Sequence, residues 1–140
     1  MSGAGAPAAV FTWPVRVYYE DTDAGGVVYY ANYLRFLERA RTEWLRAAGF
    51  EQPQLLRDFD VIFVVRALTI EYLRPAHFND LLSVTVSPLH LGRSVLDLAQ
   101  TIERDALLVT ARVKIACVQA STFRPTGIPA VLRNRLESLS

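Results

Sequence analysis

The sequence predicts an α+β domain in which one amphipathic helix packs on a sheet of long strands. Apolar residues recur every three or four positions across residues 32–49, which is the spacing of one helix face. Four long segments rich in β-branched residues follow between residues 61 and 119. Because the apolar face of the helix has nothing else to pack against, we expect it to be buried on the sheet.

A first strand is expected over residues 13–20, where apolar and polar residues alternate. This strand runs into a loop that carries Asp21, Asp23 and the glycine pair Gly25-Gly26. Aspartate and glycine both favour turns, so this loop separates the first strand from the helix.

The helix of residues 32–49 has two different faces. Its apolar face is predicted to consist of Tyr33, Leu37, Ala40, Trp44 and Ala47. Charged residues, mostly arginine and glutamate, occupy the opposite face. Gly49 is placed to end the helix in the left-handed conformation, because it has no Cβ to clash there.

The remaining elements are one polar connection, four strands and a short final helix. Residues 50–60 form the connection, and the strands are expected over residues 61–73, 81–91, 94–103 and 107–119. The first of these strands would be roughly 40 Å long if fully extended, so it must curve. Pro129 is placed to start the helix, which continues through Leu132 and Leu136. We expect residues 1–10 to form a flexible tail and residues 11–140 to form one domain.

Composition narrows the possible partners and compartments. The chain has 140 residues and a formal net charge of +1, so no strongly basic face favours a nucleic-acid partner. Cys117 is the one cysteine, so no internal disulfide forms, and its place on the apolar face of a strand predicts a core residue. A cytoplasmic location is the simplest expectation. We expect neither a signal peptide nor a membrane-spanning segment, because the apolar run 61–65 is far too short.

The loop before the helix is the predicted site of chemistry. A carboxylate delivered there lies beside the unpaired backbone N–H groups of a helix start, which can hold the oxygen of an attacked carbonyl. For Asp21 and Asp23 the alternative is turn chemistry, in which each side chain accepts from its own downstream backbone. A calcium loop is set aside, because Gly25 and Asn32 stand where that loop requires carboxylates.

The two histidines, His77 and His90, lie apart from this motif in the sequence. Neither has a second histidine or a cysteine at ligand spacing, so no metal site is predicted. We expect them to occupy surface or loop positions.

Three segments resemble a known family, the hotdog-fold acyl-CoA thioesterases, in the 4-hydroxybenzoyl-CoA thioesterase and Tol-Pal-associated (YbgC-type) branch. They are residues 13–29, which include the motif Asp21-Thr22-Asp23-Ala24-Gly25-Gly26, residues 38–43, and residues 63–66 with Glu71-Tyr72. The resemblance covers most of the chain. It implies a curved antiparallel sheet wrapped around a central helix, in a homodimer or homotetramer whose sites lie at the subunit interface.

The resemblance also implies roles for particular residues. Asp23 matches the catalytic aspartate, which either attacks the thioester carbonyl or acts as general base on a water. The backbone N–H of Tyr30 matches the donor that holds the oxyanion. The implied substrate-binding residues are Gly25, Gly26, Val27, Tyr29, Tyr33, Arg93 and Ser94. No metal or cofactor is implied, since coenzyme A enters as part of the acyl-CoA substrate.

One departure from the family motif concerns Tyr30, where the Tol-Pal-associated branch commonly has histidine. A phenol is a poor general acid or base near neutral pH, so no proton-transfer role is expected of this side chain. The absence of a histidine near the helix also argues against a hotdog dehydratase. The alternative from a different class is a non-catalytic acyl-carrier or cell-envelope (Tol-Pal) partner that retains the acyl pocket. The resemblance also implies acyl carrier protein, Tol-Pal components and the inner membrane face as candidate partners.

Overall fold

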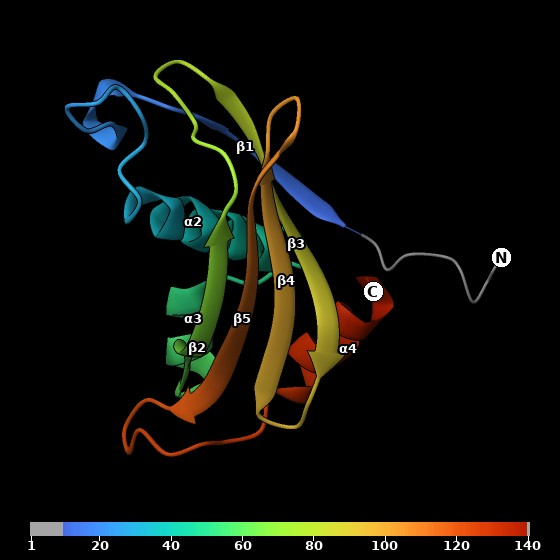
Figure 1. Cartoon of the computed structure of the whole chain (residues 1–140). Helices are drawn as coiled ribbons and strands as arrows, with labels where there is room; N and C mark the ends of the chain where they lie inside the picture. Colours follow the sequence, from blue (N-terminus) through green and yellow to red (C-terminus); the bar gives the residue numbers. More distant parts are fainter. Residues whose placement is uncertain (1–9, 140) are drawn as a thin grey trace, which may run out of the picture.

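A computed structural model describes residues 10–139 as a five-stranded antiparallel sheet with helices against it (Figure 1). The strands lie in the order β1-β3-β4-β5-β2. Their bounds are Phe11–Arg16 for β1, Val61–Tyr72 for β2, Leu81–Leu91 for β3, Val95–Glu103 for β4 and Leu107–Gln119 for β5. The expected N-terminal tail falls outside the described residues, except for Val10.

The four long strands are confirmed to within one residue at each end, whereas the first strand differs. β1 ends at Arg16, and Tyr19–Asp21 forms a single 3-10 turn, η1. The prediction of a strand to residue 20 was therefore wrong in its second half. The physical reason is Asp21, whose carboxylate accepts the N–H of Tyr18 and turns the chain back on itself.

Strand β2 lies at the edge of the sheet and pairs with β5 along its whole length. Strands β3, β4 and β5 form a simple meander, but β2 does not join it through β3. The pairing of β2 with β5 slips by one residue between Val65 and Ala67, where a bulge lets this long strand curve. The outer edge of β2 is left without a neighbouring strand among the residues described.

Helix α2 (Asn32–Ala47) crosses the concave face of the sheet, and its apolar face forms the centre of the core (Figure 1). The predicted face is confirmed at Tyr33, Leu37, Ala40 and Trp44, all buried. Ala47 was wrongly included, because Ala48 continues the four-residue spacing from Trp44 and is 1% exposed. A curved sheet around a central helix is the hotdog architecture that the resemblance implied.

Gly49 ends this first helix as predicted, with φ of +94°. Helix α3 (Gln52–Phe59) was not anticipated, because the segment is short, mostly polar and contains Pro53. Proline is compatible with the first turn of a helix, and Glu51 with Gln54 forms a capping box there. Only Leu55 of this helix is buried, so its apolar signal is weak.

Helix α4 (Ala130–Leu139) follows Pro129 as predicted and buries Leu132 and Leu136 against the sheet. Within residues 10–139 no helix is both long enough and apolar enough to cross a bilayer.

Candidate active site

The loop of residues 22–31, which we call the carboxylate loop, is folded by its own backbone. The N–H of Asp23 donates to the carbonyl of Val27 at 2.9 Å, and the N–H of Gly26 donates to the carbonyl of Asp23 at 3.0 Å. Gly26 has φ of +81°, a conformation that favours glycine. The glycine pair therefore makes a tight turn directly after Asp23.

Asp21 is a structural residue in this fold. It is 6% exposed, and both of its carboxylate oxygens accept hydrogen bonds at 2.8 Å, one from the backbone N–H of Tyr18 and one from the side-chain amide of Asn32. Its carbonyl also accepts the N–H of Tyr29 at 2.9 Å. These contacts fix the loop to the start of α2 and leave this carboxylate no free oxygen for chemistry.

Asp23 is solvent-exposed, and its carboxylate is only half satisfied. Oδ1 accepts the N–H of Gly25 at 2.8 Å, which is the local turn contact considered as an alternative from the sequence. Among the residues that the structure describes, Oδ2 has no hydrogen-bond partner. The turn contact thus orients the carboxylate and leaves one oxygen available to a ligand.

The backbone N–H of Tyr30 has no acceptor within the described part of the chain. It lies two residues before the first residue of α2 and one before the N-cap residue Ala31. Unpaired N–H groups at a helix start attract negative charge, helped by the helix dipole. Tyr30 as a residue is 61% exposed, so it lies at the surface of the molecule.

Tyrosines from two elements surround this position. The ring of Tyr30 lies 4.9 Å from that of Tyr29 and 6.3 Å from that of Tyr72 at the end of β2. Tyr72 also lies 5.5 Å from the ring of Tyr33, and its hydroxyl is 3.4 Å from the carbonyl of Tyr30. Sequence reasoning gave Tyr72 no role, although it falls in one of the segments that carry the resemblance.

The segment of residues 76–80, which we call the 76–80 turn, packs directly on the carboxylate loop. The N–H of Val28 donates to the carbonyl of Ala76 at 2.9 Å, and the N–H of Ala76 donates to the Tyr33 hydroxyl at 3.0 Å. His77 pairs with Val27 as an antiparallel bridge. His77 is therefore close to the motif in space although it lies far from it in the sequence. Its side chain is 53% exposed, as expected of a loop position.

The electrostatics of Tyr33 report the same closeness. Burial raises the pKa of its hydroxyl, the hydrogen bond from Ala76 lowers it, and the negative charges of Asp23 and Asp80 raise it again. The Tyr33 ring is 4% exposed, so among the predicted binding residues it lies deepest.

Arg93 and Ser94 lie far from the carboxylate loop in a single copy of the chain. They form the hairpin between β3 and β4, at the opposite end of the sheet from the loop that precedes α2 (Figure 1). The 11 residues of β3 separate this hairpin from the 76–80 turn, a distance of roughly 36 Å in an extended strand. The structure brings together the other predicted binding residues, but not these two.

A partly enclosed cavity of about 180 Å³ lies between α2, α3 and the sheet, and neither Asp23 nor Tyr30 lines it. Its walls are mainly apolar, and Arg41 enters it with a pKa lowered by burial. Elsewhere Cys117 is buried, as predicted, and burial raises the pKa of its thiol to about 11. No three His, Cys, Asp or Glu side chains gather as a metal site within residues 10–139.

Comparison with known proteins places this chain in a family. Residues 25–112 match the Thioesterase superfamily. The acyl-CoA thioesterase YbgC of Haemophilus influenzae is 46% identical over 120 residues, which cover 85% of this chain and 88% of that protein. The acyl-CoA thioester hydrolase YbgC of Escherichia coli O6:H1 is 45% identical over 122 residues, covering 86% and 90%.

A solved structure agrees with these relatives. The probable thioesterase from Bartonella henselae superposes with a TM-score of 0.83 at 37% identity, over 86% of this chain and all of that one (100%). The structural match and the family match therefore agree. This chain belongs to the hotdog-fold thioesterase superfamily.

Proposed function

We propose that this chain hydrolyses acyl-CoA thioesters to a free acid and coenzyme A, with Asp23 as the catalytic carboxylate. The observation that carries the proposal is that one short loop presents both an exposed carboxylate with one free oxygen, that of Asp23, and the free backbone N–H of Tyr30. A thioester suits such a site, because its thiolate leaves readily once the carbonyl is polarised. The names of the two YbgC relatives support the same reaction.

Two routes use the free oxygen of Asp23. In the first, it attacks the carbonyl carbon, the C–S bond breaks, and water then hydrolyses the resulting mixed anhydride. In the second, it takes a proton from a water whose oxygen attacks the carbonyl, and the tetrahedral intermediate expels the thiolate. In both routes the carbonyl oxygen gains negative charge, which the N–H of Tyr30 stabilises together with the dipole of α2.

The substrate would approach along Gly25, Gly26 and Val27, with Tyr29 and Tyr33 beside the reacting carbonyl. Arg93, which could meet a phosphate of coenzyme A, and Ser94 stay predicted substrate-binding residues. The chain is proposed to work without a metal or a further cofactor, in the cytoplasm.

A homo-oligomer built through β2 follows from the exposed edge of the sheet. β2 has an unpaired outer edge and exposes Val65, Leu68 and Tyr72, which are 51%, 37% and 45% accessible. An unpaired strand edge with apolar side chains favours pairing with another strand, and a second copy offers the same edge in antiparallel orientation. This arrangement would bring two copies of Tyr72 and the neighbouring tyrosines toward one interface.

The test is thiol release from short-chain, long-chain and aromatic acyl-CoAs by the wild type and by Asp23→Asn. We expect the isosteric change to lower kcat by about 10²- to 10⁴-fold with the oligomeric state unchanged. Asp58→Asn, an exposed carboxylate on α3, is the matched control and should retain full activity. Rapid-quench mass spectrometry separates the two routes, because only direct attack adds the acyl mass to the protein.

Full activity in Asp23→Asn, or no hydrolysis by the wild type, would refute the catalytic assignment. Binding of acyl carrier protein or Tol-Pal components without hydrolysis would instead favour a non-catalytic partner.

A further inference from the structure

The 76–80 turn is held on both sides by backbone hydrogen bonds. On one side it is tied to the end of β1, because the N–H of Val17 donates to the carbonyl of Asp80 and the N–H of Asn79 donates to the carbonyl of Val17, each at 2.9 Å. On the other side Ala76 accepts from Val28 of the carboxylate loop. The turn is therefore a bridge between the sheet and that loop.

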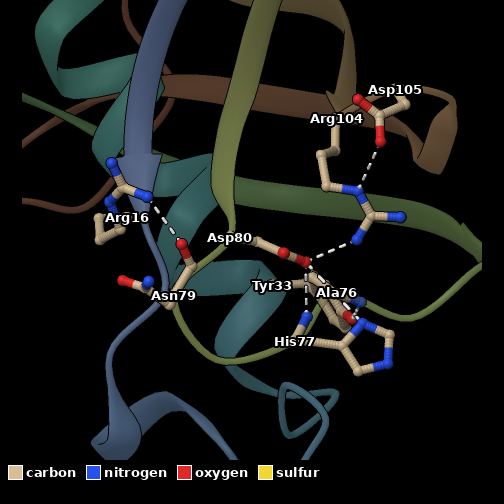
Figure 2. Close-up of polar contacts among 8 residues, drawn as sticks. All are labelled: Arg16, Tyr33, Ala76, His77, Asn79, Asp80, Arg104 and Asp105. Atoms are coloured by element: carbon tan, nitrogen blue, oxygen red, sulfur yellow. Dashed lines mark hydrogen bonds and ion pairs between the residues drawn. The ribbon is translucent and has the colours of Figure 1, made fainter.

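The carboxylate of Asp80 closes this turn (Figure 2). Its Oδ2 accepts the backbone N–H of His77 at 2.8 Å and Nη1 of Arg104 at 2.6 Å. The imidazole Nδ1 of His77 lies 3.9 Å from the same oxygen. One charged atom thus joins the turn to an arginine from a different part of the sheet.

Arg104 is itself anchored in the hairpin between β4 and β5. Its backbone N–H donates to the carbonyl of Ala106 at 3.1 Å, and its Nε lies 3.5 Å from Oδ2 of Asp105. Its side chain is 30% exposed and that of Asp80 is 20% exposed, so water screens this pair less than a fully exposed one.

The pKa of Asp80 agrees with this geometry. Burial raises it, but the hydrogen bonds from His77 and Arg104 and the charge of Arg104 together lower it below the usual value of an aspartate. The carboxylate is therefore ionised at neutral pH, and its pairing with Arg104 is an interaction between two full charges.

We propose that Asp80, held by Arg104, is a positioning residue for the carboxylate loop. This inference rests on the proposed function, in which Asp23 and the N–H of Tyr30 perform the chemistry. The path runs from Asp80 through the backbone of residues 76 and 77 to Val27 and Val28, which lie between these two groups in the chain. Asp80 touches neither group, so it acts through the placement of the loop.

Loss of the charge on Asp80 loosens the turn without removing its backbone bonds. Asn at this position keeps the size of the side chain and an oxygen for the N–H of His77, but it loses the ion pair with Arg104. Displacements of about 1 Å can cost about a hundredfold in rate when they separate catalytic groups. A partly loosened loop should cost less, and we expect a fall in kcat of about tenfold.

The experiment compares Asp80→Asn with Asp97→Asn by steady-state thioester hydrolysis and by amide hydrogen exchange. Asp97 is the matched control, because its side chain is 21% exposed and forms an ion pair with Arg112 at 3.2 Å on the sheet. For Asp80→Asn we expect kcat to fall about tenfold, KM to stay within about twofold, and the Val28 amide to exchange about tenfold faster. Asp97→Asn should leave all three unchanged.

Variants of Arg104 provide the second arm, which also applies if Asp80→Asn does not fold. Arg104→Met should reproduce the loss of kcat and the faster Val28 exchange, whereas Arg104→Lys, which keeps the charge, should restore most of both. An unchanged kcat in Asp80→Asn and Arg104→Met, or a lower kcat with unchanged Val28 exchange, overturns the inference.

Asp23→Asn in the same assay separates this inference from the proposed function. Full activity of Asp23→Asn defeats the proposed function, while the Val28 amide still reports whether Asp80 holds the loop. An inactive Asp23→Asn together with a fully active Asp80→Asn defeats the positioning role alone.

Discussion

The hydroxyl of Tyr33 holds one end of the 76–80 turn, and its removal gives a prediction with a defined magnitude. Ala76 is fully buried, and its N–H donates to that hydroxyl at 3.0 Å. Tyr33→Phe keeps the ring and its edge contact with Phe36 but leaves this buried N–H without an acceptor. An unsatisfied buried donor costs about 1–3 kcal/mol of the free energy of unfolding.

That cost converts into a measurable change in melting temperature. At about 2.1 cal/mol/K per residue, the unfolding entropy of this chain is about 0.3 kcal/mol/K near its midpoint. Tyr33→Phe should therefore lower Tm by about 3–10 °C in thermal unfolding at fixed protein concentration. The matched control is Tyr72→Phe. The hydroxyl that it removes lies 3.4 Å from the carbonyl of Tyr30, and Tyr72 is 45% exposed. This control should change stability by less than about 0.5 kcal/mol.

The pH dependence of stability in the wild type and in Tyr33→Phe tests the same hydrogen bond. Burial raises the pKa of Tyr33 in the folded state, so its contribution is present below the unfolded pKa of about 10 and is lost as pH rises through the folded pKa. Tyr33→Phe has no group to titrate, so its stability deficit relative to the wild type should shrink above about pH 10. A Tm change no larger than that of Tyr72→Phe would refute the assigned hydrogen bond.

Three further outcomes are expected from other parts of the molecule. Arg104→Met should lower the stability at pH 7, because it removes the ion pair with Asp80. The folded pKa of Asp80 is lowered, so this deficit should persist down to about pH 4, the unfolded value, and disappear only as pH falls through the lower folded pKa. A deficit that does not change in acid titrations would contradict the role of this pair. Burial raises the pKa of the Cys117 thiol to about 11, so about one thousandth of it is ionised at pH 8 and it should resist iodoacetamide. Rapid alkylation of the folded protein, measured by mass spectrometry, would contradict its burial. The double variant Val65→Lys, Leu68→Lys should lower the mass of the oligomer measured by light scattering, because charged side chains protect a strand edge from pairing. An unchanged mass would place the contact between subunits elsewhere.

The sequence contains enough local information to predict most of the fold. Helical spacing locates α2, and long β-branched segments locate β2 to β5, because each signal arises within one element. The order of strands is a different matter. β2 pairs with β5 rather than with its neighbour β3, and that choice depends on contacts between segments about 50 residues apart.

The candidate site could be predicted only in part, because some of its contacts also join segments that are far apart in the chain. Asp23 and the glycine turn lie together in the chain, so their motif is visible at once. His77 and Asp80 contact the carboxylate loop and Arg104 only because two strand ends and a hairpin meet in space. No residue spacing along the chain predicts these contacts. The separation of Arg93 from the loop likewise follows from the length and direction of β3.

The two aspartates of the motif differ by two positions, yet their surroundings assign them opposite tasks. Asp21 faces inward, and its two oxygens accept hydrogen bonds from Tyr18 and Asn32. Its loss would leave the buried amide of Asn32 and the part-buried N–H of Tyr18 without these acceptors. Asp23 faces solvent and uses one oxygen for the Gly25 turn, so its loss would cost the fold little. The Asp21 carboxylate fixes the loop to α2. The Asp23 carboxylate has a free oxygen, which under the proposed function acts on a thioester carbonyl held by the N–H of Tyr30. We therefore expect Asp23→Asn to keep the stability of the wild type and Asp21→Asn to be less stable than the wild type.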